Sequence, residues 1–525
     1  MGAKDPSIDA VVISNVAEDA YLEKLGYKQE LKRSFSLLGM VGFSFSIITS
    51  WTALGGVLIT GVNAGGPAVM IYSWIGISLL SICVAYSLAE MCSALPLAGG
   101  QYSWVAVLAP PKIARGASWV TGWFLITGVL AMGATNNFVG SNFILGQVNL
   151  TYPDFVIERW HTVLVSYAVG LFGAFMNFGG PRFLERVSKF AIVWNISAFV
   201  IVVVVVLSMN DHKQPASFVF QDFQNFTGFG PAMAAILGIL QSAFGMCCYD
   251  APAHMTEEMK NATREAPRAM VMSVCIGAVT GIIFLVSICF CIGDLEATAA
   301  TTTGVPLIQI FYDSTGSKVG TCFLSSLIVC INLLCASALQ AEGSRSLYAF
   351  ARDNGLPLSR FWAKVDKRTD VPLNALALTV IAQFALCAID FGTVTGFNTV
   401  IAIATEGFYL SYAMPLGARI ISALAGRSRK LEGPYSLGKY SLPLNIISFV
   451  FLLFASITFN FPTSNPVTEE NMNYTSAALG VIAVISAITW ITTGRHKFTG
   501  PDMENDQENE RGSVPEKLKE SIISD

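Results

Sequence analysis

Ionisable side chains interrupt a long apolar run between residues 244 and 270, FGMCCYDAPAHMTEEMKNATREAPRAM. Asp250, His254, Glu257 and Glu258 are groups that could contact a charged substrate or carry a proton. Near the centre of a bilayer such groups are costly, so they are retained mainly where a binding site or a permeation path needs them. The stretch therefore predicts a membrane transporter with this segment in its path.

The same stretch contains residues that can interrupt a helix. Gly245 and Pro252 flank residues 247–250; Pro lacks an amide donor and Gly tolerates unusual dihedral angles. Asp250 is therefore expected beside unwound backbone near mid-membrane. His254 and the glutamates after it follow at helical spacing toward water, where the stronger interpretation is that they are interfacial charges.

A second cluster, GFSFSIITSWTALGG, spans residues 42–56. Small hydroxyl residues and glycines in one membrane helix permit either close helix packing or a local break that exposes backbone groups. Composition alone favours packing slightly. In a discontinuous helix the amino-terminal half-helix end attracts an anionic group, while freed carbonyls hold cations.

Other polar residues lie within apolar runs. Glu342 and Arg345 are three residues apart and are expected to pair on one helical face. Glu406, followed by Tyr409 and Tyr412, allows either a structural or a functional interpretation. The eleven cysteines fall in or beside apolar runs without a paired zinc-site spacing, so we expect neither an exterior disulfide framework nor a metal site.

Composition identifies a polytopic membrane protein. Of 525 residues, 53% are hydrophobic and only 13% are charged, which is too little polar surface for a soluble chain of this length. About 20 helical residues cross a bilayer. The sequence predicts an all-α fold with twelve such spans, near residues 36–62, 68–96, 118–147, 162–180, 188–208, 231–254, 269–292, 319–345, 372–390, 393–418, 442–462 and 474–494.

The positive charges orient these spans. With a cytoplasmic amino terminus, every Lys and Arg except Arg159, Lys213 and Lys318 falls in a cytoplasmic segment. Both termini are then cytoplasmic. Residues 1–35 and 496–525 are polar, and we expect flexible tails that either carry trafficking or ubiquitylation signals or have no specific role.

Soluble-enzyme signatures are missing from the sequence. There is no GxxxxGK[ST] phosphate loop, GxSxG elbow or HExxH motif. We therefore expect transport powered by an ion gradient, no enzymatic activity, no cofactor and no nucleic-acid partner. The expected partners are a small-molecule substrate and the lipid bilayer.

Three motifs carry a family resemblance. They are SLAEMCSALPLAGGQY at 87–102, YDAPAHMTEE at 249–258 followed by Ala266-Pro267-Arg268, and SRSLYAFARDNGLP at 344–357. Together they resemble the amino acid–polyamine–organocation superfamily, most closely its fungal amino acid/choline/GABA permease branch. The resemblance implies a leucine-transporter-like domain over residues 36–495. Its inverted repeats would lie near residues 36–208 and 231–418, its first and sixth helices would be broken, and two further helices would follow.

The resemblance also implies where the substrate binds. Its carboxylate would meet backbone amides of the first-helix break, and its ammonium would meet carbonyls of the sixth-helix break. The implied substrate-site residues are Ser46, Ile47, Thr49, Ser50, Trp51, Phe244, Gly245, Tyr249 and Asp250.

The coupling ion implied by the resemblance is a proton. Many proton-coupled relatives have a fifth-helix lysine near this site, and Asn195 stands there in this chain. The proton-carrying group is therefore left open. The candidates for ion coupling or gating are Asn195, Asp250, His254 and Glu406.

We expect proton-driven import of a small, GABA-like amino acid across the plasma membrane, with a vacuolar or other endomembrane as the alternative. A choline or related quaternary amine permease is the main rival, because Trp51, Phe244 and Tyr249 could enclose such a head group by cation–π contacts. A nutrient sensor that binds without transporting is a remote alternative.

Overall fold

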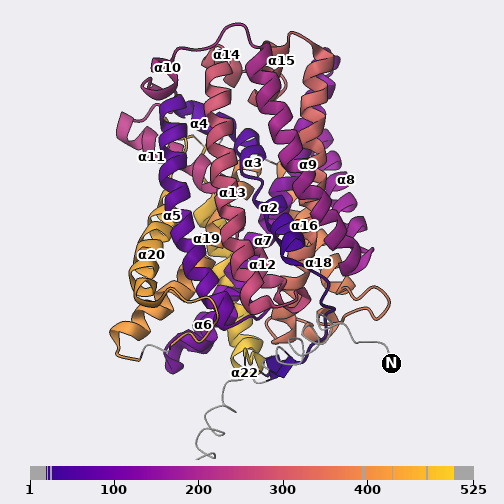
Figure 1. Cartoon of the computed structure of the whole chain (residues 1–525), viewed down its shortest axis with the longest axis vertical. Coiled ribbons are helices and arrows are strands. Elements are labelled where there is room, and N and C mark those ends of the chain that lie inside the picture. Colours follow the sequence, from indigo (N-terminus) through magenta and orange to yellow (C-terminus); the bar gives the residue numbers. More distant parts are fainter. Residues whose placement is uncertain are drawn as a thin grey trace, which may run out of the picture.

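Long apolar helices run between two ends of the molecule (Figure 1). The computed structural model describes residues 19–20, 22–23, 26–392, 396–427, 430–468 and 471–501. The helices of the first half are α2 (Leu37–Ile48), α3 (Ser50–Gly56), α4 (Leu58–Asn63), α5 (Gly66–Ala94), α6 (Gln101–Leu108), α7 (Pro111–Thr151), α8 (Arg159–Asn177), α9 (Gly180–Met209), α10 (Ala216–Phe220), α11 (Pro231–Gly245), α12 (Ala251–His254) and η1 (Thr256–Glu258).

The second half continues with α13 (Ala262–Cys291), α14 (Leu295–Ala299), α15 (Pro306–Thr315), α16 (Lys318–Arg352), α17 (Ser359–Trp362), α18 (Leu373–Cys387), η2 (Ala388–Phe391), α19 (Gly396–Leu424), η3 (Gly438–Tyr440), α20 (Ser441–Thr458), α21 (Thr475–Thr489), η4 (Trp490–Gly494) and α22 (Arg495–Lys497). Two short strands, β1 (Ala64–Gly65) and β2 (Gln224–Asn225), pair antiparallel.

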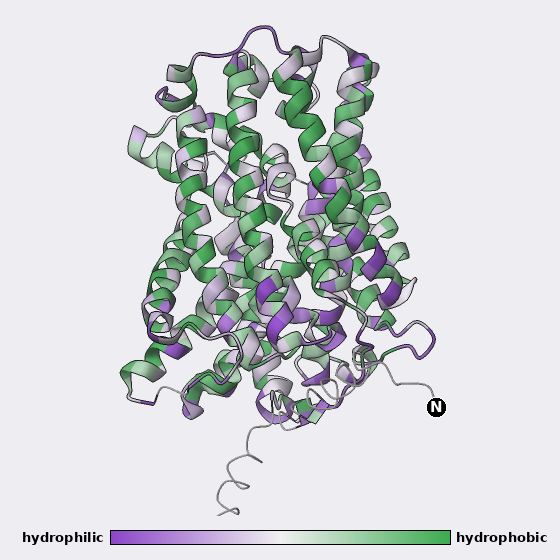
Figure 2. Cartoon of the chain, in the orientation of Figure 1, coloured by the Kyte–Doolittle hydropathy of each residue, from purple (hydrophilic) through white to green (hydrophobic). Residues whose placement is uncertain are grey.

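Nine helices in the described part of the chain are long and apolar enough to cross a membrane. Figure 2 shows their largely hydrophobic surfaces, with hydrophilic residues gathered toward the lower part of the bundle. The nine are consistent with a polytopic membrane protein; the count of twelve spans stays a prediction. Helices α8, α11 and α19 correspond to the fourth, sixth and tenth predicted spans but are not among these nine. Helix α11 has only 15 residues because the helix ends at Gly245.

The two ends of the bundle differ in what they carry. We call the end with α10, α14 and α15 the upper end, and the end with α6 and α22 the lower end (Figure 1). Between them, the first span is the most buried of the nine, and α2 packs against α9, α13 and α16. Residues of the first span therefore lie at the core of the bundle.

The first span is broken at Thr49. This residue has φ 31° and ψ 41°, ends α2 and precedes α3. A left-handed conformation is unfavourable for a β-branched residue, so it marks a defined interruption of the helix. Packing also uses this span: a Cβ on Gly42 would meet the Ser188 carbonyl oxygen at 2.2 Å. The slight preference for packing over a break was therefore wrong for Thr49 and right for Gly42.

The sixth predicted span is broken as well. Helix α11 ends at Gly245, residues 246–250 connect it to the short α12, and Cys248 in this connection has φ 61°. The interruption lies where Gly245 and Pro252 predict it. The chain therefore has two interrupted helices, each with a non-glycine residue at positive φ.

The described terminal segments pack against the bundle. Tyr27, Leu31 and Phe35 are buried, and the amides of Ser34 and Phe35 donate to the Glu258 carbonyl oxygen at 2.8 and 3.0 Å. Near the other terminus, Phe498 is buried among aromatic rings of α6, α7 and α16. The packed part of the protein thus extends beyond the predicted limits at residues 36 and 495.

Candidate substrate and ion-coupling site

The two interrupted helices face each other across a small cavity, which we call the central cavity. Its volume is about 40 Å³, room for a water molecule but not for an amino acid. It is lined by Ile47, Ile48, Thr49, Thr52 and Ala53 of the first break, Phe244, Cys247 and Cys248 of the second, and residues of α7 and α16: Met132, Thr135, Asn136, Val139, Asn332, Cys335 and Leu339. A molecule the size of an amino acid would fit here only if these elements moved apart.

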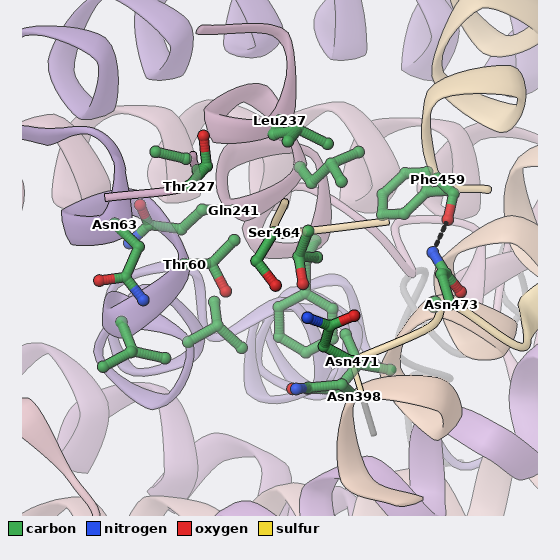
Figure 3. A pocket seen from close by; sticks show the side chains of 18 of the residues that line it. Thr60, Asn63, Thr227, Leu237, Gln241, Asn398, Phe459, Ser464, Asn471 and Asn473 are labelled. Atoms are coloured by element: carbon green, nitrogen blue, oxygen red, sulfur yellow. Dashed lines mark hydrogen bonds between the residues drawn. The ribbon is translucent and has the colours of Figure 1, made fainter. Parts of the chain in front are cut away.

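A larger cavity of about 430 Å³ is lined by residues of α4, α11, the start of α19 and the segment 459–473, and we call it the upper vestibule (Figure 3). Its polar lining consists of amides and hydroxyls, among them Asn63, Gln241, Asn398, Asn471 and Ser464. None of the described residues that line it is ionisable. Phe244 lines both cavities and so forms the partition between them.

Asp250 is the centre of a buried hydrogen-bond cluster. Its Oδ2 accepts from Gln101 Nε2 at 2.6 Å and lies 3.0 Å from His254 Nε2. Its Oδ1 accepts from the Tyr412 hydroxyl. His254 Nδ1 lies 3.0 Å from the Ala98 carbonyl oxygen. Elements α6, α12 and α19 therefore converge on one carboxylate.

Glu342 on α16 completes the cluster. Asp250, His254 and Glu342 each present one oxygen or nitrogen within 4.8 Å of the others, and all three are fully buried. These are the described residues that could hold a metal ion. The positions such an ion needs on Asp250 and His254 are used by their hydrogen bond to each other, so the geometry is that of a proton-sharing group.

The prediction that Glu342 pairs with Arg345 was wrong. Arg345 Nε lies 2.7 Å from Glu258 Oε1, and Arg345 also donates to Ser344 and Asn177. The η1 turn brings Glu258 to α16, so that Arg345 pairs with Glu258 and not with Glu342 on its own helix. Local spacing could not reveal this contact between residues far apart in the sequence.

The predicted first-break residues divide into two groups. Ile47 and Thr49 line the central cavity. The Ser46 hydroxyl instead donates to the Gly42 carbonyl at 2.6 Å, and the Ser50 side chain lies against Gly277 of α13. Of these residues, Ile47 and Thr49 are the two that the structure places at the central cavity.

Trp51 points away from the central cavity. Its Nε1 donates to Asn195 Oδ1 at 2.7 Å, and its ring packs between Phe199 and Phe284. Asn195, a candidate for ion coupling, therefore fixes the first-helix break to α9 and lies outside the Asp250 contacts.

The aromatic enclosure suggested for a quaternary amine is not assembled in the described residues, because only Phe244 of its three members lines the central cavity. The fully buried Tyr249 ring packs on Tyr412 with centroids 5.1 Å apart. Gly245 serves packing, since a Cβ there would meet Trp74 at 3.0 Å.

Glu406 has a partner away from the cluster. Its Oε1 accepts from Asn460 Nδ2 at 2.9 Å. The structure thus brings Asp250 and His254 together among the predicted coupling residues and leaves Asn195 and Glu406 elsewhere. Gln101, Tyr412 and Glu342 were missed as site residues, although Tyr412 and Glu342 lie in stretches whose polar residues stood out and Gln101 lies in one of the three family motifs.

The lower end is closed by buried ion pairs. Arg352 binds Glu257 at 2.8 Å, and Arg345 binds Glu258 at 2.7 Å. The two glutamates and His254 are buried, so their interpretation as interfacial charges beside water was wrong. The turn after α12 places them against α16, out of solvent.

Asp353, just after α16, joins both described terminal regions. It accepts hydrogen bonds from Tyr27 at 2.9 Å and Tyr102 at 2.9 Å, and its carbonyl accepts from the Thr499 amide. Burial raises the pKa of Asp353 to about 6, against the lowering effects of Arg352 and the two tyrosine hydroxyls. Burial and the Asp353 charge also raise the pKa of Tyr27 well above its ordinary value.

Comparison with known proteins gives a consistent set of matches. The family model described as "Amino acid permease" matches residues 35–486. A Macrophomina phaseolina protein named "Putative amino acid/polyamine transporter" is 60% identical over 440 residues, which is 84% of this chain and 97% of that protein.

Two more distant relatives have names of other kinds. Amino-acid permease BAT1 of Arabidopsis thaliana is 32% identical over 91% of this chain and 95% of its own length. The choline transporter of Saccharomyces cerevisiae is 32% identical over 91% of this chain and 84% of its own.

Proposed function

The chain belongs to the amino acid permease family, and we propose that it imports a small, GABA-like zwitterionic amino acid by proton-coupled secondary transport. As a member of this family it is an integral membrane transporter of small molecules and not an enzyme. The finer proposal is supported above all by one observation: two interrupted helices present backbone groups to the same central cavity.

The first break supplies the groups that a carboxylate needs. The amides of Thr52 and Ala53 donate hydrogen bonds to the Thr49 carbonyl oxygen at 2.8 and 3.0 Å. The amides of Ser50 and Trp51 start α3, where helical geometry provides no preceding carbonyl. They are the proposed donors to the substrate carboxylate.

The second break supplies acceptors for an ammonium group. Helix α11 ends at Gly245, so its last carbonyls lack the amide partners of a continuing helix. The connection to α12 runs beside the central cavity through Cys247 and Cys248. Asp250 then holds this connection in place through its contacts with Tyr412 and Gln101.

The proposed topology has twelve spans, with residues 36–208 and 231–418 as inverted repeats. The upper end faces the exterior and the lower end faces the cytoplasm, in keeping with the positive charges of the loops. Both termini are then cytoplasmic, and the proposed location is the plasma membrane. The structure corresponds to a state with an open upper vestibule and a closed lower end.

The part of the vestibule lining that the structure describes is uncharged and favours a zwitterion over a cation. A quaternary amine would find no attracting carboxylate among the described lining residues, whereas a zwitterion can bond to their amides and hydroxyls. Choline is nevertheless the second candidate, because one relative is named a choline transporter.

Uptake measurements test the proposal. Radiolabelled GABA uptake by cells that express the full chain should be competed by small amino acids and abolished by a protonophore. Choline and polyamines should compete weakly. Strong competition by choline, or uptake that resists the protonophore, would reject the substrate or the coupling proposal respectively.

A further inference from the structure

His254 and Asp250 form a buried hydrogen-bonded pair. His254 Nδ1 faces the Ala98 carbonyl oxygen, which can only accept, so Nδ1 carries a hydrogen. Nε2 lies 3.0 Å from Asp250 Oδ2, and a hydrogen bond there needs a proton on one of these two atoms. Because Asp250 also accepts from Gln101 and Tyr412, the arrangement fits an ionised Asp250 beside a protonated His254.

Glu342 stands next to this pair without a partner. Within the residues that the structure describes, neither carboxylate oxygen of Glu342 has a hydrogen-bond partner, although the side chain is fully buried. A buried, unpaired carboxylate is costly, and a proton or a cation removes the cost. With Asp250 and His254 neutral as a pair, an ionised Glu342 leaves the cluster with one net negative charge.

We propose that Glu342 binds the coupling proton, with the His254–Asp250 pair as its fixed electrostatic partner. The proposal rests on proton-coupled transport as the function of the chain. Hydronium from the exterior side donates a proton to the Glu342 carboxylate and leaves as water, and the cluster becomes neutral. When the lower end opens, Glu342 transfers that proton to cytoplasmic water as hydronium and becomes a carboxylate again.

The position of Glu342 links the proton to the substrate. Asn332, Cys335 and Leu339 of α16 line the central cavity at successive three- and four-residue intervals. Glu342 follows Leu339 by three residues, so it lies one turn further along the same helical face. The second break contacts both places, since Cys247 and Cys248 line the cavity and Asp250 belongs to the cluster.

The surroundings of Glu342 contain few other titratable groups. Helix α2 has none, and Arg345, one turn along α16, is paired with Glu258. The remaining groups on the packed elements are the thiols Cys247, Cys248 and Cys335 beside Glu342, Lys112 and Arg115 of α7, Arg159, His161 and Tyr167 of α8, Arg182, Glu185, Arg186 and Lys189 of α9, Tyr312 and Asp313 of α15, Arg360 of α17, Cys387 of α18, and Lys318, Cys322, Cys330, Tyr348 and Arg352 of α16 itself. The charged side chains of α7, α8 and α9 lie within the first three turns of their helices. Among the described residues of the cluster, Glu342 is the acid whose two oxygens both lack a hydrogen-bond partner.

Transport in proteoliposomes provides the first test. We expect Glu342→Gln to exchange internal for external GABA near the wild-type rate while losing stimulation by an inward proton gradient. Glu342→Asp should keep the stimulation because it keeps a carboxylate, and Glu406→Gln should keep it because Glu406 lies outside the cluster. Retained stimulation in Glu342→Gln would overturn the proposal, and so would loss of exchange together with uptake in correctly folded protein.

Infrared spectroscopy provides a test that needs no substrate. On acidification, the wild-type full chain and Glu406→Gln should show a protonated-carboxyl band that Glu342→Gln lacks. An unchanged band in Glu342→Gln would overturn the proton site. If the band behaves as expected but the wild type shows no gradient-driven uptake, the proposed function fails while the proton site stands.

Discussion

Asp250 is the single side chain on which three elements of the site depend. Gln101 of α6, His254 of α12 and Tyr412 of α19 all direct a polar atom at its carboxylate. We expect Asp250→Asn to abolish or severely reduce uptake, because an amide nitrogen cannot accept hydrogen bonds that two oxygens now accept. Uptake and surface expression are measured together. Undiminished uptake in the variant would remove the role assigned to Asp250.

Asp353 makes stability depend on pH. Its pKa is raised to about 6 in the folded protein, above the ordinary value of 3.8. Between these values the folded state binds more protons than the unfolded state, so the contribution of Asp353 to stability falls as pH rises from 3.8 to about 6. The loss is about 3 kcal/mol at most. We expect Asp353→Asn to lose less stability over this interval, measured by thermal unfolding from pH 4 to pH 7.

Asp366→Asn is the matched control for that measurement. Asp366 is an aspartate of the lower-end loop, and hydrogen bonds from Thr369 lower its pKa, which is the opposite direction. Its substitution should leave the fall in stability between pH 4 and pH 6 in place. A pH profile of Asp353→Asn that matches the wild type would show that the buried carboxylate does not titrate in this range.

The presence of Glu342 in an apolar run is evident from the sequence, but its lack of a partner is not. A glutamate inside an apolar run is conspicuous, and spacing offered Arg345 as a partner. The real partner of Arg345 is Glu258, on a turn that only the folded chain brings to α16. The family resemblance places the substrate near both breaks, but long-range pairing decides which buried acid is left free.

A buried hydrogen bond joins the first-helix break to α9. The Trp51 indole donates to Asn195, and both side chains are buried. Asn195→Ala leaves a buried indole N–H without its acceptor, so we expect a loss of about 1–3 kcal/mol in unfolding free energy. In a Trp51→Phe background the same substitution should cost less, because the donor is already gone.

A double-mutant cycle measured by denaturant or thermal unfolding gives that coupling directly. Val202→Ala, on the same helix and buried without a side-chain hydrogen-bonding group, is the control and should cost the same in either background. Equal costs of Asn195→Ala in both backgrounds would show that the bond does not stabilise the break.

The residues themselves predict the place of the second break, whereas the first break is implied only by the family resemblance. Gly245 and Pro252 mark the second break because they disturb helical bonding intrinsically. Thr49 carries no such signal, and its left-handed conformation depends on the packing of α2 and α3 against their neighbours. Tertiary contacts therefore decide which residue of the small, hydroxyl-rich stretch is bent.

The whole molecule combines an open cavity at one end with a closed opposite end. The hydropathy and the charge pattern of the sequence suffice to predict a helical membrane bundle, because the bilayer requires long apolar spans and determines on which side the positive charges lie. The closed lower end could not be predicted, since it depends on Arg345 and Arg352 meeting two glutamates far away in the sequence. The packing of residues 26–35 at the lower end also could not be predicted, because it too depends on contacts with residues far away in the sequence.

Phe244 is the side chain that separates the upper vestibule from the central cavity, and it is nearly buried. We expect Phe244→Ala to join the two cavities and to cost about 3–5 kcal/mol of stability. Maleimide added from the exterior should then modify Cys247 and Cys248 faster than in the wild type, as measured by mass spectrometry of the labelled peptide.

The control for this variant is Leu237→Ala, which removes a vestibule residue that does not line the central cavity. It should leave the labelling rate of Cys247 and Cys248 unchanged. Equal labelling rates in folded Phe244→Ala and wild type would mean that another barrier separates the cavities. Faster labelling would identify the Phe244 ring as the gate that must move before a substrate can reach the two helix breaks.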